Sequence, residues 1–188
     1  IPNMTVMSPK NRWEMADMIR FAVDFAGPVA VRYPRGGAYE GLQEFRAPVV
    51  YGKSEVLYRE EDIAVLFVGH MSSLAEEVRM EMKKAGLGCT LVNARFVKPL
   101  DKELLRELSK GHRLLATIEE NVLTGGFGSQ VREYVLRKGL SMQVCCIGIK
   151  DTYVEHGSVD VLRKETGLEK GSAVRCILKA YGKCCDAA

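Results

Sequence analysis

The feature of this sequence that most constrains its fold is an alternation, after about residue 60, between short apolar runs and helical stripes. None of the runs alternates apolar with polar residues, and they span 63–68, 89–92, 114–118 and 143–147. Strands that are buried on both faces have this pattern. Between the runs, apolar residues recur at helical spacing, as in Leu74, Val78 and Met82. The order predicts an α/β fold of three αβα layers, with a mostly parallel sheet between helices.

Capping residues and loop lengths predict helix boundaries and one edge strand. Ser72 or Ser73 is expected to cap the first of these helices, and Asp101 the second. A possible strand at 49–57 is only a few residues from the run at 63–68, whereas a parallel crossover needs about a dozen. We therefore expect this strand to be antiparallel and at an edge. Two helices near 158–166 and 172–181 are expected to complete the chain.

The amino-terminal segment has too few predicted elements for a domain of its own. We expect residues 1–8 to form a loop, a helix to begin at Ser8-Pro9 and a strand to span 29–33. A single strand leaves backbone hydrogen-bonding groups unpaired on both sides. We therefore interpret the segment as the tail of a larger α/β domain whose other strands are missing. The predicted division is residues 1–36 for this tail, 37–48 for a linker and 49–188 for a complete domain.

Charge and cysteine content argue against several classes of function. The chain has 27 basic and 24 acidic residues without a long basic run, which disfavours nucleic-acid binding. No apolar stretch reaches the roughly 20 residues needed to span a bilayer, and the amino terminus lacks the pattern of a secretory signal. The six cysteines have no metal-ligand spacing and form no C-x-x-C pair. We expect a reduced, cytoplasmic protein without a metal site.

A glycine-rich turn and two acidic residues follow the third apolar run. Gly125-Gly126-Phe127-Gly128-Ser129 precedes a helix, where backbone amides can bind phosphate. Its spacing matches neither a dinucleotide fingerprint nor a Walker loop, so close packing of the turn is the favoured interpretation. Glu119 and Glu120 follow the same run, and two carboxylates at this edge could serve in acid–base catalysis. Adjacent strand residues point to opposite faces, however, so the two are not expected to cooperate. An ion-pair or interface role is therefore favoured for both.

The remaining candidates are three histidines and an arginine segment. The histidines His70, His112 and His156 are far apart in the sequence; His70 is interpreted as an inert loop residue and His156 as a turn residue. Arg32 is expected inside the strand at 29–33, and Arg35 just beyond it, beside glycines that allow close approach of a ligand. A guanidinium placed there can bind a phosphate bidentately. A linker arginine in a surface salt bridge explains the pattern equally well.

Several sequence blocks, taken in order, resemble one enzyme family. They are Ile1-Pro2-Asn3-Met4 with Met7-Ser8-Pro9, Val31-Arg32-Tyr33-Pro34-Arg35-Gly36, Arg95-Phe96-Val97-Lys98-Pro99-Leu100-Asp101, and Glu119-Glu120-Asn121 with the glycine-rich turn. The blocks are similar to those of the 1-deoxy-D-xylulose-5-phosphate synthases, thiamine-diphosphate enzymes related to transketolase. The resemblance spans nearly the whole chain. Transketolases and 2-oxo-acid dehydrogenase β subunits share the architecture, but the second and third blocks favour the synthases.

The resemblance implies that this chain is the carboxy-terminal portion of a three-domain enzyme. It would hold a transketolase C-terminal domain, preceded by the tail of the pyrimidine-binding domain. The family condenses pyruvate, with loss of CO2, and D-glyceraldehyde 3-phosphate, and the product feeds isoprenoid, thiamine and pyridoxal synthesis. The family's motifs for thiamine diphosphate and Mg²⁺ are not found here. The resemblance therefore implies no catalytic, cofactor-binding or metal-binding residue in this chain, and no activity of the chain alone.

One binding residue and the partners are also implied by the resemblance. Arg35 matches the arginine that binds the phosphate of the aldehyde substrate. His70 departs from the small hydroxyl residue that is common in the family, and Glu155-His156-Gly157 lies in a variable block. The expected partners are the amino-terminal part of the enzyme and a second copy in a homodimer. Two alternatives stay open: a separately encoded half of a split transketolase, and a 2-oxo-acid dehydrogenase β subunit that acts as an assembly module.

Overall fold

A computed structural model describes residues 1–186, so the last two residues of the predicted 49–188 domain lie outside the described part. The larger of its two sheets has the strand order β3-β5-β4-β7-β8. β3 pairs with β5 antiparallel, and the other pairs are parallel. The strands are β3 (Glu55–Tyr58), β4 (Asp62–Phe67), β5 (Cys89–Asn93), β7 (His112–Val122) and β8 (Gln143–Ile149). The predicted mostly parallel sheet with an antiparallel edge strand is confirmed, although that strand begins later than expected.

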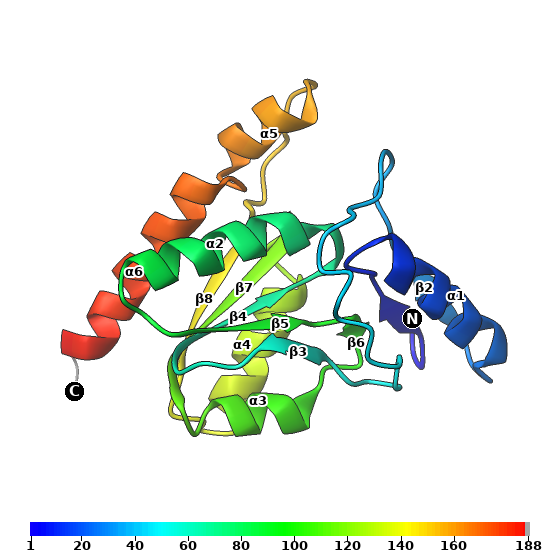
Figure 1. Ribbon diagram of the computed structural model, residues 1–188, viewed down its shortest axis with the longest axis horizontal. Helices are drawn as coiled ribbons and strands as arrows, with labels where there is room; N and C mark the ends of the chain where they lie inside the picture. Colours follow the sequence, from blue (N-terminus) through cyan, green and yellow to red (C-terminus); the bar gives the residue numbers. More distant parts are fainter. Residues whose placement is uncertain (187–188) are drawn as a thin grey trace.

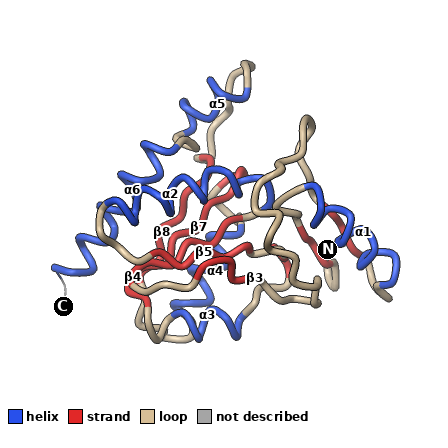
Figure 2. Tube along the Cα trace, viewed as in Figure 1, coloured by secondary structure: helices blue, strands red, loops and turns tan. Residues whose placement is uncertain are grey.

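Helices cover both faces of the larger sheet, which confirms the three-layer αβα arrangement (Figure 1). α2 (Ser72–Lys84) and α6 (Lys170–Asp186) cover one face, and α3 (Lys102–Leu108) and α4 (Phe127–Arg137) cover the other (Figure 2). The 3₁₀ helix η1 (Gly69–Met71) joins β4 to α2, and α5 (Val159–Thr166) extends away from the layers. None of the described helices is long and apolar enough to cross a bilayer.

The apolar runs lack alternation because each central strand contributes to two cores. In β4, Ile63 and Val65 join the core beneath α2 and α6, whereas Ala64 and Leu66 join the core beneath α3 and α4. All four residues are buried. A polar residue on either face of this strand would lose its hydration without gaining a partner.

The smaller sheet has the order β2-β1-β6, and it combines two strands of the amino-terminal segment with one from the middle of the sequence. β1 (Thr5–Met7) pairs in parallel with β2 (Val29–Val31), and on its other side it pairs antiparallel with β6 (Phe96–Lys98). The expectation that residues 1–8 form a loop is therefore wrong, and so is the expectation that the strand after α1 (Arg12–Asp24) stands alone. The three-residue strands are too short to show a clear alternation in the sequence.

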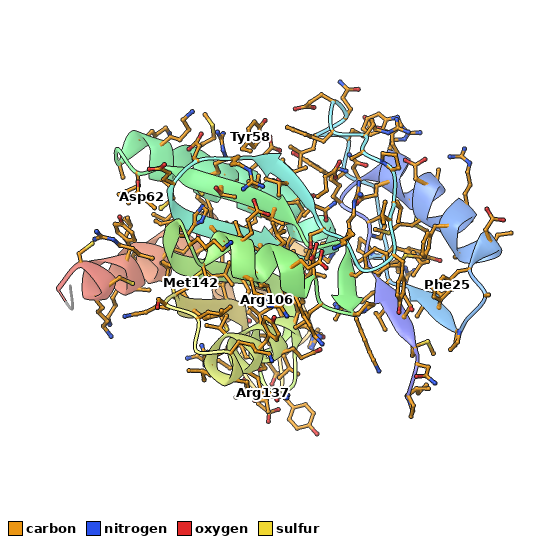
Figure 3. The ribbon with its side chains drawn as sticks, turned by 90° about the horizontal axis from the view of Figure 1, so that it is seen from below. Phe25, Tyr58, Asp62, Arg106, Arg137 and Met142 are labelled. Carbon is orange, nitrogen blue, oxygen red and sulfur yellow. The ribbon has the colours of Figure 1, made fainter. Side chains whose placement is uncertain are left out.

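A small core that includes aromatic side chains stabilises the smaller sheet. Met7, Met18 and Phe96 are almost fully buried in it. Phe21 lies edge-on to Phe96, with ring centroids 5.9 Å apart, and stacks on Phe25 at 5.3 Å. Figure 3 shows Phe25 at the end of the molecule that carries this sheet, and Asp62 of β4 near the opposite end. Because Phe96 belongs to β6, this core joins the amino-terminal segment to the larger unit.

Two predicted helix starts are displaced because serine hydroxyls serve other contacts. α1 begins at Arg12, and its N-cap is Asn11, whose side-chain oxygen accepts from the Glu14 amide at 3.0 Å. The Ser8 hydroxyl donates instead to the Arg32 carbonyl at 2.8 Å. The Ser72 hydroxyl donates to the Lys10 carbonyl at 2.8 Å, and α2 has no side-chain N-cap. The predicted cap Asp101 is confirmed, since it accepts from the Leu104 amide at 3.1 Å.

The segment between the two units is packed against the larger one. Leu42 is 3% exposed and belongs to the core beneath α2 and α6, although the sequence around it is polar and rich in glycine. The Asn11 side chain donates to the Gly41 carbonyl at 2.9 Å.

The loop that follows β8 is exposed up to α5, and α5 itself has no fully buried residue.

A buried ionic cluster lies where the two units meet, and we call Lys10, Glu14, Glu55, Asn93 and Arg95 the interface cluster. Each of the five is at most 6% exposed. Its two cations and two carboxylates balance in charge. The members come from the segment before α1, from α1, from β3, from the end of β5 and from the turn before β6.

Every charge in the interface cluster has a close partner. Lys10 Nζ lies 3.0 Å from Glu14 and 2.6 Å from Glu55, and Arg95 lies 2.8 Å and 3.0 Å from the same two carboxylates. The Asn93 amide donates to both oxygens of Glu14 at 2.9 Å. Arg95 also donates to the Pro48 and Ala47 carbonyls at 2.8 and 2.7 Å. Such saturation is what allows charges to remain in a low-dielectric interior.

The charge of Glu14 is favoured inside this cluster. Burial alone raises the pKa of a carboxyl, but Lys10 and Arg95, together with the hydrogen bonds from Lys10 and Asn93, outweigh burial, and the pKa of Glu14 lies below its ordinary value. Because the pKa of Glu14 is lowered in the folded protein, ionised Glu14 stabilises the fold at pH values above its ordinary pKa of 4.5. This contribution is lost as the pH falls through the native pKa.

We predict that Glu14→Gln lowers the free energy of unfolding by about 3–5 kcal/mol at pH 7, because it leaves two buried cations with one carboxylate. The gap between the variant and the wild type should narrow as the pH falls from 4.5 through the lowered native pKa of Glu14, because the carboxylate is then protonated in the wild type as well. Urea unfolding monitored by circular dichroism at several pH values measures both effects. The control is Glu133→Gln, which removes an exposed pair with Arg137 and should cost under about 1 kcal/mol. Equal losses in the two variants would contradict the prediction.

Candidate functional site

The arginine segment after β2 lies at the edge where the two units meet. Arg32 follows β2 directly rather than lying inside it, although its amide still donates to the Met7 carbonyl at 2.8 Å. Its guanidinium donates to the Glu120 carbonyl at 2.7 Å. Arg32 therefore links the smaller sheet to β7 of the larger one.

Arg35 is exposed, and within residues 1–186 its guanidinium has neither a hydrogen bond nor an ion pair. The alternative that Arg35 is a linker arginine in a surface salt bridge is therefore not supported among these residues. Gly36, with a φ of 127°, and Gly37 have no described atom within 4 Å of where a side chain would begin. The backbone beside Arg35 is therefore open to a ligand.

An open pocket of about 100 Å³ adjoins this segment. Its walls come from both units and from the segment between them: Pro9, Lys10, Asn11, Met15, Tyr33, Pro34, Gly36, Gly37, Ala38, Tyr39 and His70. Arg35 lies between two of these residues in the chain without lining the pocket itself. A mostly apolar pocket with a free guanidinium at its border suits a small anionic ligand.

Glu120 gathers three elements beside the pocket. One carboxylate oxygen contacts His70 Nε2, and the other lies 3.5 Å from Arg163 Nε of α5. The hydrogen bond from His70 lowers the pKa of Glu120, and the nearby Arg163 adds to this effect against the opposing effect of burial. The ion-pair role predicted for Glu120 is confirmed. His70, interpreted as an inert loop residue, is instead part of this contact.

Glu119 points to the other side of β7 and caps α4. Its two carboxylate oxygens accept from the amides of Phe127 at 2.8 Å and Gly128 at 2.7 Å. Glu119 is 1% exposed, and burial raises its pKa, although both amides and Arg32 act in the opposite direction. The opposite orientations of Glu119 and Glu120 confirm that they do not form a cooperating pair.

The glycine-rich turn is closely packed, as predicted. A side-chain carbon at Gly126 would lie 2.4 Å from the Val122 carbonyl oxygen, and one at Gly128 would lie 2.5 Å from the Thr117 hydroxyl. The amides that start α4 are already bonded to Glu119. A phosphate or diphosphate placed there would meet a carboxylate, so this turn does not fit the phosphate-binding role.

The other candidate residues are dispersed. His112 is buried, with its ring nitrogens bonded to the Leu108 carbonyl at 2.9 Å and the Thr90 hydroxyl at 2.8 Å, whereas His156 is exposed in the loop before α5. Among residues 1–186, no three His, Cys, Asp or Glu side chains are grouped to hold a metal ion. The interface cluster was missed because its members are far apart in sequence. The only local signal was Lys10 and Glu14 at i,i+4 spacing.

These features define a class of protein: a three-layer αβα unit joined to a smaller, three-stranded sheet. Residues 52–172 match the family described as the transketolase, C-terminal domain, and the chain belongs to this family. It is 42% identical to a 1-deoxy-D-xylulose-5-phosphate synthase of Lachnoclostridium phytofermentans over 97% of its length, and 42% identical to one of Heliobacterium modesticaldum over 93%. It spans 29% and 27% of those two relatives.

Solved structures agree with the fold. A structure titled split gene transketolase, inactive beta4 tetramer, matches 97% of this chain and 59% of its own with a TM-score of 0.90 and 26% identity. A transketolase of Campylobacter jejuni matches 95% of this chain and 26% of its own with a TM-score of 0.73. Its identity is 20%, so it bears on the fold alone.

We predict that Gly126→Ala destabilises the protein by about 1–3 kcal/mol, because the added carbon meets backbone that cannot move aside. Thermal unfolding followed by circular dichroism measures the loss. Gly111→Ala is the matched control, since nothing described lies within 4 Å of the added carbon there and its φ is not in the left-handed region. Similar unfolding temperatures for the two variants would show that the turn is not closely packed.

Proposed function

We propose that this chain is the carboxy-terminal portion of a 1-deoxy-D-xylulose-5-phosphate synthase. The supporting observation is the 37–42% identity to synthases of this name over 93–97% of the chain, in relatives of which the chain spans 27–29%. The whole enzyme would join pyruvate, after loss of CO2, to D-glyceraldehyde 3-phosphate. Its product would serve isoprenoid, thiamine and pyridoxal synthesis.

We propose a division of labour between this portion and the rest of the enzyme. Thiamine diphosphate and Mg²⁺ would be bound by upstream domains. In support, the amides of the glycine-rich turn already donate to the Glu119 carboxylate, and no group of His, Cys, Asp or Glu side chains suited to a metal ion is found within residues 1–186. We propose residues 1–36 as the tail of the pyrimidine-binding domain, 37–48 as a linker and 49–188 as the C-terminal domain. The enzyme would be a cytoplasmic homodimer in which this portion braces the catalytic domains.

Arg35 is proposed to bind the phosphate of the aldehyde substrate. An exposed guanidinium without a partner among the described residues retains its donors for a ligand, and the open glycines beside it let a phosphate approach. A planar fork of donors matches two phosphate oxygens at once. The mostly apolar pocket next to it would enclose the short carbon chain.

A second candidate is a separately encoded half of a split transketolase. It is favoured by the high structural similarity to the split gene transketolase structure, at a TM-score of 0.90. The two candidates differ in the length of the natural subunit. The synthase requires one chain that continues upstream of Ile1, whereas the split enzyme requires two chains encoded apart.

The proposed reaction is tested with the full-length protein, thiamine diphosphate, Mg²⁺, pyruvate and D-glyceraldehyde 3-phosphate. We expect 1-deoxy-D-xylulose 5-phosphate, identified by mass spectrometry, from the full-length protein and no turnover from the 188-residue chain alone. Turnover by the chain alone would overturn the assignment of the cofactor site to upstream domains. Transfer of two-carbon units between sugar phosphates, without use of pyruvate, would favour the split transketolase.

We predict that Arg35→Ala in the full-length enzyme raises the KM for D-glyceraldehyde 3-phosphate roughly tenfold or more, because a hydrogen bond to a charged group is worth about 1.5–3 kcal/mol. Decarboxylation of pyruvate should be unaffected. Steady-state kinetics with each substrate varied separates the two effects. Arg20→Ala, which removes another exposed arginine of the same segment, is the control. It should change neither the KM for D-glyceraldehyde 3-phosphate nor the rate of pyruvate decarboxylation. Unchanged kinetics of Arg35→Ala would remove the assignment.

A further inference from the structure

Two cysteines that are distant in the sequence meet between β8 and α6. The sulfurs of Cys145 and Cys176 lie 3.2 Å apart, although 31 positions separate the residues in the chain. Cys145 is 8% exposed on the sheet, and Cys176 is exposed on the helix. No other pair of thiols among residues 1–186 is in hydrogen-bond contact, so this pair is distinct from the remaining cysteines.

The packing of α6 holds the two thiols in register. Ala173 and Ile177 are fully buried against the larger sheet, and they flank the position of Cys176 on the helix. Cys146, the neighbour of Cys145 in β8, lies on the opposite face of the sheet, where its sulfur is beside Gly128 of α4. Only one of the two adjacent cysteines of β8 can therefore reach α6.

The two thiols differ in reactivity. Burial, together with the hydrogen bond to Cys176, raises the pKa of Cys145 to about 12, so that its thiolate is scarce at neutral pH. Cys176 is exposed to solvent and can be approached by a small molecule. A disulfide bond is about 2.05 Å long, so the sulfurs must approach by roughly 1 Å, which side-chain rotation on the helix can supply.

We infer that Cys145 and Cys176 form a reversible disulfide site that reacts with low-molecular-weight disulfides. The thiolate of Cys176 attacks one sulfur of the small disulfide, whose S–S bond breaks and releases one thiolate. Cys145 then attacks the sulfur of Cys176, transfers its proton to a leaving thiolate and displaces the second small thiol. Two protein thiols are oxidised to one disulfide, and the small disulfide is reduced to two thiols.

The bond would attach the carboxy-terminal helix covalently to the sheet. It closes a loop from Cys145 to Cys176 that contains the exposed segment before α5 and α5 itself. Closing a loop of this length restricts the unfolded chain more than the native one. For a protein of this size, the expected gain corresponds to a rise of roughly 5–10 °C in unfolding temperature. This site does not depend on the proposed reaction.

The test treats the full chain with oxidised glutathione and analyses it by intact mass and by peptide mapping without reduction. We expect the loss of two hydrogens, a peptide pair that joins Cys145 to Cys176, and the higher unfolding temperature. Dithiothreitol should reverse all three. Cys176→Ser should show no cross-link and no rise in unfolding temperature, whereas Cys185→Ser, which removes another exposed thiol of α6, should behave as the wild type.

Three results would overturn the inference. The first is a stable glutathione adduct on Cys176 that does not proceed to an internal bond. The second is a cross-link that joins other cysteines, such as Cys146 or Cys185. The third is a Cys145–Cys176 bond that leaves the unfolding temperature unchanged or lowers it, since the helix would then not be held in its native position. Because the replaced residues Cys176 and Cys185 are both exposed, loss of folding is not expected to obscure the comparison.

Discussion

The buried interface cluster is the constraint on which the rest of the structure depends. It brings Lys10 and Glu14 of the amino-terminal segment against Glu55 and Arg95 of the larger unit, with every charge paired. Charges that are taken out of water are tolerated only when their partners are in place, so the two units have one compatible arrangement. Arg95 adopts a left-handed backbone conformation, with a φ of 55°, which is unfavourable for a side chain of this size. Its hydrogen bonds to the segment between the units offset this cost.

The position of the candidate binding edge follows from that arrangement. Once β1 lies beside β6, β2 ends close to β7, and Arg32 can donate to the Glu120 carbonyl. The pocket beside Arg35 has walls from both units and exists only while they are joined. Glu120 extends the same junction to η1 and α5 through His70 and Arg163. An anion-binding role for Arg35 would therefore depend on residues that never touch the ligand.

The acidic residues of β7 show how one strand can serve two unrelated tasks. Glu119 faces α4 and neutralises the partial positive charge of its first amides, whereas Glu120 faces the junction and pairs with a histidine and an arginine. The two pKa values move in opposite directions because burial dominates at Glu119 and hydrogen bonding dominates at Glu120. In this chain, which belongs to the transketolase C-terminal domain family, β7 thus supplies one carboxylate to a helix start and the other to an ion pair.

The sequence by itself determined the three-layer architecture, the antiparallel edge strand, the cap at Asp101 and the opposite orientation of Glu119 and Glu120. These features depend on local periodicity and on loop length, which are readable over a few residues. The tertiary structure alone decided the smaller sheet, the displaced starts of α1 and α2, the interface cluster and the Cys145–Cys176 pair. Each of these joins residues that are far apart in the chain, and Ser8 and Ser72 show that a hydroxyl suited to a local cap can be used by a distant carbonyl instead. Contacts of this kind depend on which surfaces meet after folding, and no short-range pattern records that.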